Sequence, residues 1–516
     1  MTGIGLRLVR CFYRDSDVAS VDRFQYRGVL IFLSHAVVTA PAVFCNQASG
    51  SPVSFRRLPQ RFGHGTRGVP LAISSGVWHQ PAPDSDAQAH VSRALERLTT
   101  LTAVLSRPIV GFFTQFYGRT PMAEKSYDPS EVFAHAAKIP PRVFAAPQRY
   151  IQGAGVLENT GHYVKSLMRV NRAGILASKR GWSSQAAQVA ESLTAQSIES
   201  VAAEFNGECS RLEIEMQSAA LLEQQIDFLI AVGGGKVVDA GKCIAHRLEV
   251  PVVVVPTLAS TDAPCSALSV VYTPEGSTDY VEFFRQNPEM VIVDTDVVAS
   301  GSERFLVAGM GDAMATWFEA RVCLNNPNAR NMLGALPTLA SYAIGQTCAH
   351  ALFEHGEVAA ESVRQNRNNE SVDRIVEANT LLSGLGFESG GLALAHAVAV
   401  SFPAIEIVHD NYLHGEMVAM GTMIQLAMEQ SDDAERVAKF FARVGLPIHF
   451  EQLSLALSQR GHLDRLIEAT LQRAIAHHMP MPVNAESLRR AIDDAHRLGR
   501  AVAAEVGDER YRQLHK

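Results

Sequence analysis

Three polar residues in the second half of the sequence are of types that bind metal ions. Asp312 lies in AGMGDAMATWFEA, His396 in GFESGGLALAHAVAV and His414 in NYLHGEMVAMG, so each lies among small apolar residues. Neutral imidazole and carboxylate suit zinc or iron(II), and three protein ligands leave a coordination position open for a substrate. The separations of 84 and 18 residues form no local motif, and a lone histidine is more often a hydrogen-bonded core residue. Spacing alone therefore leaves both interpretations open.

A glycine-rich turn is the second candidate site. In DFLIAVGGGKVVDAGK, Gly233, Gly234 and Gly235 stand between a predicted strand and a predicted helix, and Lys236 follows them. Glycine lets the backbone approach a pyrophosphate closely, and the N-terminus of a helix offers free N–H groups and a positive dipole end. The sequence is neither GxGxxG nor a P-loop, so a phosphate-binding turn and an ordinary structural turn both fit it.

A long polar stretch follows the next predicted strand. Residues 256–273, PTLASTDAPCSALSVVYT, are mainly small and polar, whereas an ordinary connection from strand to helix takes about 2–6 residues. Ligands of parallel sheets bind beyond the carboxyl ends of the strands, where this stretch is expected to lie. The alternative is a simple turn in which Asp262 and Ser260 form local caps.

Short apolar runs rich in β-branched residues alternate with helical spacing from about residue 141 onward. This alternation with short connections predicts a parallel sheet covered by helices. After about residue 300 only Ala- and Leu-rich helical segments follow. We therefore expect a Rossmann-like α/β half over 141–300 and an all-α half over 301–516. The predicted strands are 173–177, 198–205, 227–232, 251–256 and 290–293, and the predicted helices between them include 213–225 and 237–247.

The front of the chain differs in composition from the rest. Residues 1–80 contain nine Arg, no Lys and three Asp, a balance of +6, which leaves −13 for the remainder of a chain whose net charge is −7. The apolar stretch 28–45 has 18 residues, short of the about 20 that a membrane-spanning helix needs. The alternatives are a targeting sequence, a small added domain or a poorly ordered extension over 1–140, and we expect the extension.

The composition of the whole chain excludes several classes of protein. With 516 residues, of which 47% are hydrophobic, the chain is long enough for more than one packed domain and is too apolar to be disordered. Its mildly acidic balance argues against nucleic acid or an anionic membrane as a partner. Seven Cys without a CxxC unit indicate a reducing compartment, so we expect a cytoplasmic location, although the Arg-rich front leaves organelle targeting open.

From about residue 143 to its end, roughly 370 residues, the chain resembles the glycerol dehydrogenase branch of the iron-containing (group III) alcohol dehydrogenases. The matching stretches occur in the order and at about the spacing of that family. They are RYIQGAGVLENTG (149–161), GGGKVVDAGK (233–242), PTLASTDAPCSALSVVYT (256–273), NPEMVIVDT (287–295), AGMGDAMATWFEAR (308–321), VEANTLLSGLGFESGGLALAHAV (376–398) and HGEMVAMGT (414–422).

The resemblance implies a role for individual residues. Asp312, His396 and His414 match the metal ligands of the family, with zinc usual in this branch, and Asp262 matches a residue that contacts the polyol. The positions that match contacts to NAD are Gly234, Gly235, Lys236, Thr257, Ser266, Leu268 and Tyr272. The implied architecture is that of dehydroquinate synthase, and the family commonly forms homo-oligomers.

The implied reaction is the reversible, NAD-dependent oxidation of glycerol and related 1,2-diols to hydroxyketones, dihydroxyacetone in the case of glycerol. A divalent cation would ease loss of the hydroxyl proton as hydride passes to the nicotinamide. The alternative is a lyase or cyclase like 3-dehydroquinate synthase, which would need a cluster of Lys and Arg for an anionic substrate. Arg285 and Arg304 are the only Lys or Arg residues between residues 256 and 312. This scarcity of cationic side chains favours an uncharged polyol as the substrate.

The sequence also departs from the family at a few positions. Ser178, followed by Lys179 and Arg180, stands where many relatives have an Asp that binds the adenosine ribose, so we predict that NADP is tolerated beside NAD, the main cofactor. Glu416 is either an orienting partner of His414 or a solvated residue at a helix start. The adjacent histidines 477 and 478 cannot share a helix face, and we interpret them as loop or cleft-lining residues.

Overall fold

The structure is a computed structural model that describes residues 6–9, 30–33, 127–133, 139–274 and 276–516. The chain forms two compact units, and the boundary between them lies between Val110 and Gly111. In the first unit, β1 (Leu6–Val9) and β2 (Leu30–Leu33) pair antiparallel. Most of the predicted extension 1–140 lies outside the described residues, so its state and the domain boundaries at 140 and 300 stay predictions.

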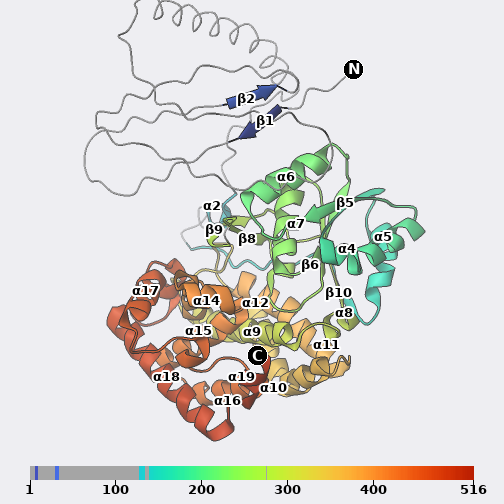
Figure 1. Ribbon diagram of the computed structural model, residues 1–516. Coiled ribbons are helices and arrows are strands. Elements are labelled where there is room, and N and C mark those ends of the chain that lie inside the picture. Colours follow the sequence, from blue (N-terminus) through green and yellow to red (C-terminus); the bar gives the residue numbers. More distant parts are fainter. Residues whose placement is uncertain (1–5, 10–29, 34–126, 134–138, 275) are drawn as a thin grey trace, which may run out of the picture. The chain divides into compact units, whose positions relative to one another are not determined.

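A six-stranded, wholly parallel sheet organises the α/β half of the second unit (Figure 1). Its strand order is β3-β10-β7-β6-β4-β5. The strands are β3 (Tyr150–Gly153), β4 (Arg172–Ser178), β5 (Glu199–Phe205), β6 (Phe228–Gly233), β7 (Val252–Pro256) and β10 (Met290–Asp294). The five predicted strands are present. The edge strand β3 was not predicted, because four half-buried residues carry too short a pattern.

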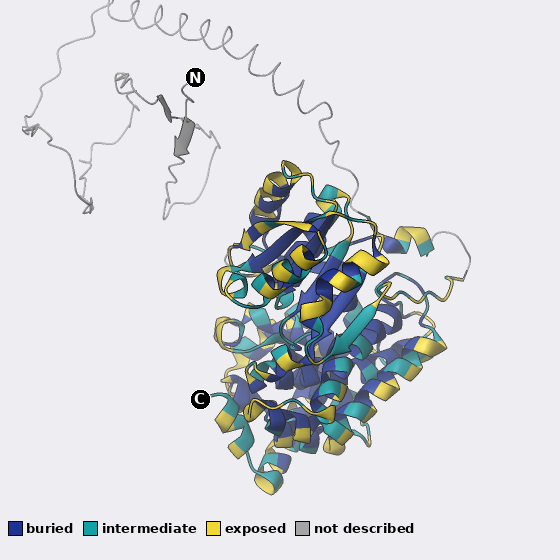
Figure 2. Ribbon diagram, turned by 90° about the vertical axis from the view of Figure 1, so that its right-hand side faces the viewer, coloured by how far each residue is buried: buried dark blue, intermediate teal, exposed yellow. Residues whose placement is uncertain are grey.

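Helices cover both faces of this sheet, which is why its central strands read as continuous apolar runs (Figure 2). Along β4, Ile175 packs in one core cluster with α3 (Thr160–Leu167) and α5 (Gln185–Ala195). Its neighbour Leu176 packs on the other face with α6 (Arg211–Leu222) and α7 (Gly235–Leu248). The period of two thus assigns alternate residues to two cores. A four-residue helix, α4 (Lys179–Trp182), follows β4 directly.

After β10 the described chain forms helices joined by loops and contains no further strand. Their common core includes the fully buried rings of Phe318, Phe402 and Phe441. The longer helices are α9 (Glu303–Asn325), α10 (Leu339–Arg364), α11 (Glu370–Glu377), α12 (Ser383–Gly390), α15 (His414–Glu429), α16 (Ala434–Val444), α17 (Arg460–Leu471) and α18 (Ala485–Val506). The shorter ones are α8 (Thr295–Ala299), α13 (Leu394–Ala399), α14 (Glu406–Asn411) and α19 (Glu509–Leu514). No single described helix is long and apolar enough to cross a membrane, although one pair bent by 101°, Glu370–Gly390 with Leu394–Ala404, passes that test jointly.

The polar stretch 256–273 is only partly a loop. Its last residues form β8 (Leu268–Tyr272), which pairs antiparallel with β9 (Thr278–Phe283). The buried Lys242 of α7 directs the preceding loop, because its ammonium group donates to the carbonyls of Ala263 at 2.9 Å and of Leu268. Asp239 lies 3.1 Å from the same ammonium group and balances its charge. The buried ammonium group of Lys242 thus fixes the path of the chain between β7 and β8.

The helices α9 and α15 approach each other closely at a glycine. A Cβ atom at Gly415, the second residue of α15, would lie 1.8 Å from the carbonyl oxygen of Ala308 on α9. We expect Gly415→Ala to destabilise the protein by about 3 kcal/mol or more, since neither backbone can yield without moving its helix.

Gly461 offers a matched control, because it is the second residue of α17 and a Cβ atom there meets nothing within 4 Å. Gly461→Ala should stabilise the protein by about 0.4–1 kcal/mol through the unfolded chain. Thermal unfolding of both variants checks the pair, and equal melting temperatures would contradict the proposed crowding at α9.

Glu388 of α12 joins the helical half to the α/β half. Its carboxylate accepts hydrogen bonds from the Ala267 amide at 2.7 Å and from Asn287 Nδ2 at 2.6 Å. Burial raises the pKa of Glu388 to about 7 from its ordinary 4.5, against the opposing effect of these donors and of Lys242. The folded protein therefore holds this proton in a pH range where the unfolded chain has lost it.

Because the ionised form of this buried carboxyl is disfavoured, the folded protein becomes less stable as the pH rises from about 4.5 to about 7. We expect Glu388→Gln to remove that dependence, so that the variant gains about 3 kcal/mol on the wild type between pH 5 and pH 8. Thermal unfolding of both proteins at the two pH values measures the difference. Parallel pH dependences of the two proteins would refute the assignment.

Candidate active site

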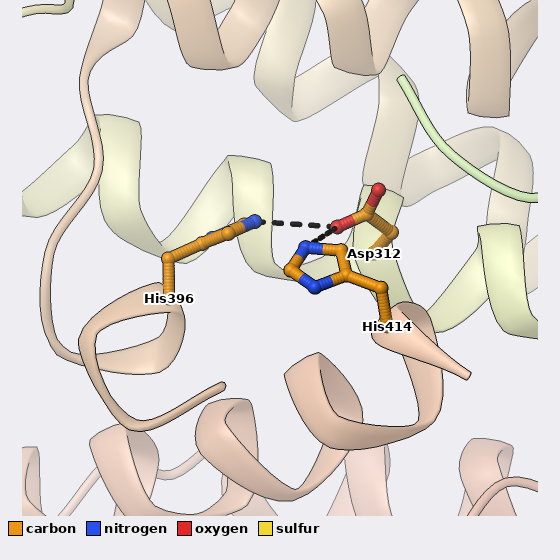
Figure 3. Close-up of side chains that lie close together, drawn as sticks. All are labelled: Asp312, His396 and His414. Carbon is orange, nitrogen blue, oxygen red and sulfur yellow. Dashed lines mark hydrogen bonds and ion pairs between the residues drawn. The ribbon is translucent and has the colours of Figure 1, made fainter. Parts of the chain in front are cut away.

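Asp312, His396 and His414 lie together although they come from three helices (Figure 3). Each offers one ligand atom, and these three atoms all lie within 4.8 Å of one another. Asp312 Oδ1 is 3.2 Å from Nε2 of His396 and 3.6 Å from Nε2 of His414. Asp312 and His396 are buried, whereas the His414 side chain is 38% exposed. The group is thus open on the side of His414.

Each helix presents its residue in a different way. Asp312 stands in the middle of the long buried helix α9, His396 lies in the short helix α13, and His414 is the first residue of α15. Pro403 lies in a short 3-10 turn between the two histidines, so they do not share one helix. Proximity here depends on the packing of α9 against α13 and α15.

A second carboxylate, which the sequence did not indicate, holds His396. Glu319 Oε2 lies 2.5 Å from His396 Nδ1, and Glu319 Oε1 accepts from the backbone amides of His396 at 2.9 Å and Ala393 at 2.8 Å. A proton on Nδ1 donates to Glu319, so Nε2 is the ring nitrogen that faces Asp312 and would bind a cation. The only signal in the sequence is a lone acid two helical turns after Asp312 in an apolar stretch.

The ionisation of the three residues follows from their surroundings. Burial lowers the pKa of the His414 imidazole and keeps it neutral. Burial alone would raise the pKa of Asp312, but the hydrogen bond from His396 and the nearby imidazoles outweigh it, and the pKa is lowered. Burial alone would lower the pKa of His396, but the charge of Glu319 and the hydrogen bond to Asp312 outweigh it and raise that pKa, so a bound cation would have to displace the proton on Nε2. The Asp312 carboxylate and the neutral His414 imidazole are already the forms that ligate metals.

The donor set fits a divalent cation. Asp312 Oδ2 is buried and has no hydrogen-bond partner, which is costly for a charged oxygen unless a cation or a donor satisfies it. Two imidazole nitrogens and one carboxylate are the ligands of catalytic zinc and iron sites. The residues therefore suit zinc or iron(II), with a coordination position left for a substrate oxygen.

Asp262 adds a further carboxylate on the side of the loop after β7. Burial raises the pKa of its carboxyl well above the usual range, and the negative charge of Asp312 adds to this. Ser383 Oγ lies 2.9 Å from Asp262 Oδ2. The structure thus brings the predicted polyol contact and the predicted metal ligands into one site.

The glycine turn lies at the switch point of the sheet. The chain leaves β4 for β5 on one side and returns to β6 on the other side, and Ala177 at the end of β4 pairs with Val232 at the end of β6. Ligands of doubly wound sheets bind at the carboxyl ends of two such strands. Ser178 and the turn Gly234–Gly235 that opens α7 occupy these two strand ends.

Comparison with known proteins agrees with this arrangement. The family model of the iron-containing alcohol dehydrogenases matches residues 147–295. A glycerol dehydrogenase of Thermotoga maritima is 45% identical over 57% of this chain and 81% of its own. One from Escherichia coli is 42% identical over 66% of this chain and 92% of its own. This chain belongs to the iron-containing alcohol dehydrogenase family. It is therefore an enzyme, an oxidoreductase.

The fold of this iron-containing alcohol dehydrogenase is also that of a solved relative. The crystal structure of glycerol dehydrogenase from Schizosaccharomyces pombe matches with a TM-score of 0.67 and 34% identity. The match covers 71% of this chain and 93% of the yeast protein. Both the Rossmann-like half and the helical half predicted from the sequence are thereby confirmed.

The other residues predicted to contact the cofactor divide into two groups. Thr257 donates its amide to the Gly233 carbonyl at 3.0 Å and so adjoins the glycine turn. Lys236 Nζ lies 5.8 Å from the centre of the Tyr272 ring and pairs with Glu208 at 2.6 Å. Ser266 and Leu268, by contrast, are buried beside Lys242. Their part in cofactor binding stays a prediction.

Glu416 is not a solvated residue, and that alternative is wrong. It is buried, its oxygens lie 2.7 and 2.8 Å from the guanidinium of Arg304, and it accepts from the Leu413 amide at 2.8 Å. The C-terminal His515 lies 3.0 Å from the same carboxylate. Glu416 therefore secures the first turn of the helix that presents His414.

The histidine pair 477–478 lies outside the metal group. Both lie in a 3-10 helix (Ala474–His478) rather than in the predicted loop, and His478 Nδ1 lies 2.7 Å from the carbonyl oxygen of Leu392.

Proposed function

We propose that this iron-containing alcohol dehydrogenase is an NAD-dependent and metal-dependent glycerol dehydrogenase. It oxidises glycerol and related 1,2-diols to hydroxyketones, dihydroxyacetone in the case of glycerol, and the reaction runs in both directions. The observation that carries the proposal is the convergence of three ligand side chains with Asp262 at one site. The glycerol dehydrogenases to which the chain is 42% and 45% identical support the substrate.

The chemistry assigns a task to each residue. A bound zinc or iron(II) ion lowers the pKa of the substrate hydroxyl and stabilises negative charge on its oxygen. Asp312, His396 and His414 would hold that ion, while Glu319 maintains the tautomer of His396. Asp262 would accept a hydrogen bond from a second substrate hydroxyl. The glycine turn and Ser178 place the dinucleotide so that hydride can pass from the substrate carbon to the nicotinamide.

The alternative of a lyase or cyclase finds no support in the charges around the site. An anionic substrate would need free guanidinium or ammonium groups. Arg304 is engaged by Glu416, and the guanidinium of Arg285 lies 5.4 Å from the centre of the Tyr127 ring. Lys242 is buried against backbone carbonyls. These engagements favour an uncharged polyol.

The direct test is formation of NADH from glycerol by the purified protein, before and after a chelator and after addition of zinc or iron(II). We expect turnover that the chelator abolishes and one of the two metals restores. If no 1,2-diol is oxidised after reconstitution with either metal, the proposed function is wrong. Turnover unaffected by the chelator would instead remove the metal from the mechanism.

The cofactor preference gives a separate prediction. Ser178 caps α4 by accepting from the Gly181 amide at 3.2 Å, and the Lys179 and Arg180 that follow are exposed. No carboxylate at this strand end repels the 2′-phosphate of NADP, so we expect kcat/KM for NAD to exceed that for NADP by less than about a thousandfold.

Ser178→Asp provides the matched variant, because a carboxylate can still cap α4 and would repel the 2′-phosphate. Its preference for NAD should rise about tenfold or more above that of the wild type. A thousandfold preference already present in the wild type would contradict this interpretation. A cytoplasmic location, inferred from the cysteine usage, and a homo-oligomeric state, implied by the family resemblance, are further proposals.

A further inference from the structure

A π-helical turn interrupts one helix beside the active site. The helices α11 and α12 are continuous through Ala378–Leu382, where the hydrogen bonds follow the wider π pattern. Such single turns occur mostly inside α-helices and often at functional sites. Because each α-helical residue turns by about 100°, the extra residue rotates the side chains that follow by that amount. Ser383 is the first of them.

Ser383 links the active-site carboxylate to the helix of the metal ligand. Its hydroxyl is fully buried and lies 2.9 Å from Asp262 Oδ2 and 2.9 Å from Thr316 Oγ1. When Asp262 is ionised, its carboxylate can only accept, so Ser383 donates to Asp262 and Thr316 in turn donates to Ser383. Thr316 is one helical turn after Asp312 on α9.

The backbone around Ser383 is built for close contact with the Asp262 loop. A Cβ atom at the next residue, Gly384, would lie 2.9 Å from Cys265 Cβ and 3.1 Å from the Asp262 carbonyl oxygen. The helix at Gly384 is therefore packed directly against the loop, and moving the two apart would open the core. Among the described residues, Ser383 is the side chain that donates to Asp262, and Oδ1 is left for another donor.

We propose that Ser383, oriented by Thr316, is a positioning residue that directs Asp262 at the second hydroxyl of a vicinal diol. The inference rests on the proposed function and deepens it, because it assigns the discrimination between diols and simple alcohols to a hydroxyl pair outside the metal site. Without the hydrogen bond from Ser383, the Asp262 carboxylate can rotate about its last side-chain bond. It then no longer keeps the orientation that lets it accept a hydrogen bond from the substrate.

The test compares oxidation of 1,2-propanediol with that of 1-propanol by the metal-loaded enzyme. We expect Ser383→Ala and Thr316→Val each to lower the ratio of the two kcat/KM values about tenfold, mainly through a higher KM for the diol. Thr316→Ser keeps the hydroxyl and should restore the wild-type ratio. Metal content should equal that of the wild type in all three variants.

Ser389→Ala is the matched control, because Ser389 is also a buried serine of α12, but within the described chain its hydroxyl bonds only the backbone of Ala145. This variant should leave the ratio of the kcat/KM values for the diol and the alcohol unchanged, although it loses the same buried hydroxyl group as Ser383→Ala. A ratio that stays at the wild-type value in both Ser383→Ala and Thr316→Val overturns the inference but leaves the proposed function standing. A wild type that oxidises neither diol nor alcohol overturns the proposed function itself.

Discussion

Replacing His414 with alanine should remove the bound metal ion and lower kcat/KM for glycerol by about a thousandfold or more, on the order of 4 kcal/mol of transition-state stabilisation. One of three protein ligands is lost, and two ligands rarely hold zinc or iron(II) against dialysis. The fold should survive, because the His414 side chain is 38% exposed at the start of α15 and its first turn is held independently by Glu416.

Metal analysis after dialysis and thermal unfolding separate these two effects. His350→Ala is a matched control: His350 is 75% exposed and pairs with Glu354, four residues along the same helix. It should retain metal and activity. Full metal occupancy in His414→Ala would refute the ligand assignment, and a collapsed melting transition would show that the histidine serves the fold instead.

Replacing Glu319 with glutamine should weaken metal binding about 10- to 100-fold, although the two side chains have the same shape. The two backbone amides, those of Ala393 and His396, can still donate to the remaining carbonyl oxygen. The new amide nitrogen then faces His396 Nδ1, where it can only donate a hydrogen bond. This forces the imidazole proton onto Nε2, the atom beside Asp312, and removes its lone pair from the metal site.

Glu319→Ala distinguishes this tautomer effect from simple loss of a buried contact. It leaves both backbone amides without an acceptor, so we expect a stability loss of about 2–5 kcal/mol, whereas Glu319→Gln should lose about 1 kcal/mol. Metal titration and thermal unfolding of the two variants measure both quantities. If Glu319→Gln binds metal as tightly as the wild type, the carboxylate does not fix the tautomer.

Much of the fold was predictable because it rests on local patterns. The strands β4, β6, β7 and β10 are apolar runs bounded by turn residues, and the predicted limits differ from the observed ones by one residue at most. The hairpin β8–β9 was missed, since small and polar residues obscure its alternation. Its course is decided by Lys242, whose contacts reach 26 residues along the chain.

The sequence by itself determined which residues have the chemistry for a metal and a dinucleotide: Asp312, His396, His414 and the glycine turn stand in motifs whose order and spacing match one enzyme family. Only the tertiary structure decided that three ligands lying 84 and 18 residues apart meet within 4.8 Å. It also revealed Glu319 and Ser383, whose partners lie 77 and 121 residues away. A buried carboxylate or hydroxyl leaves no periodic signal, because its partner is chosen by helix packing and not by neighbours in the chain.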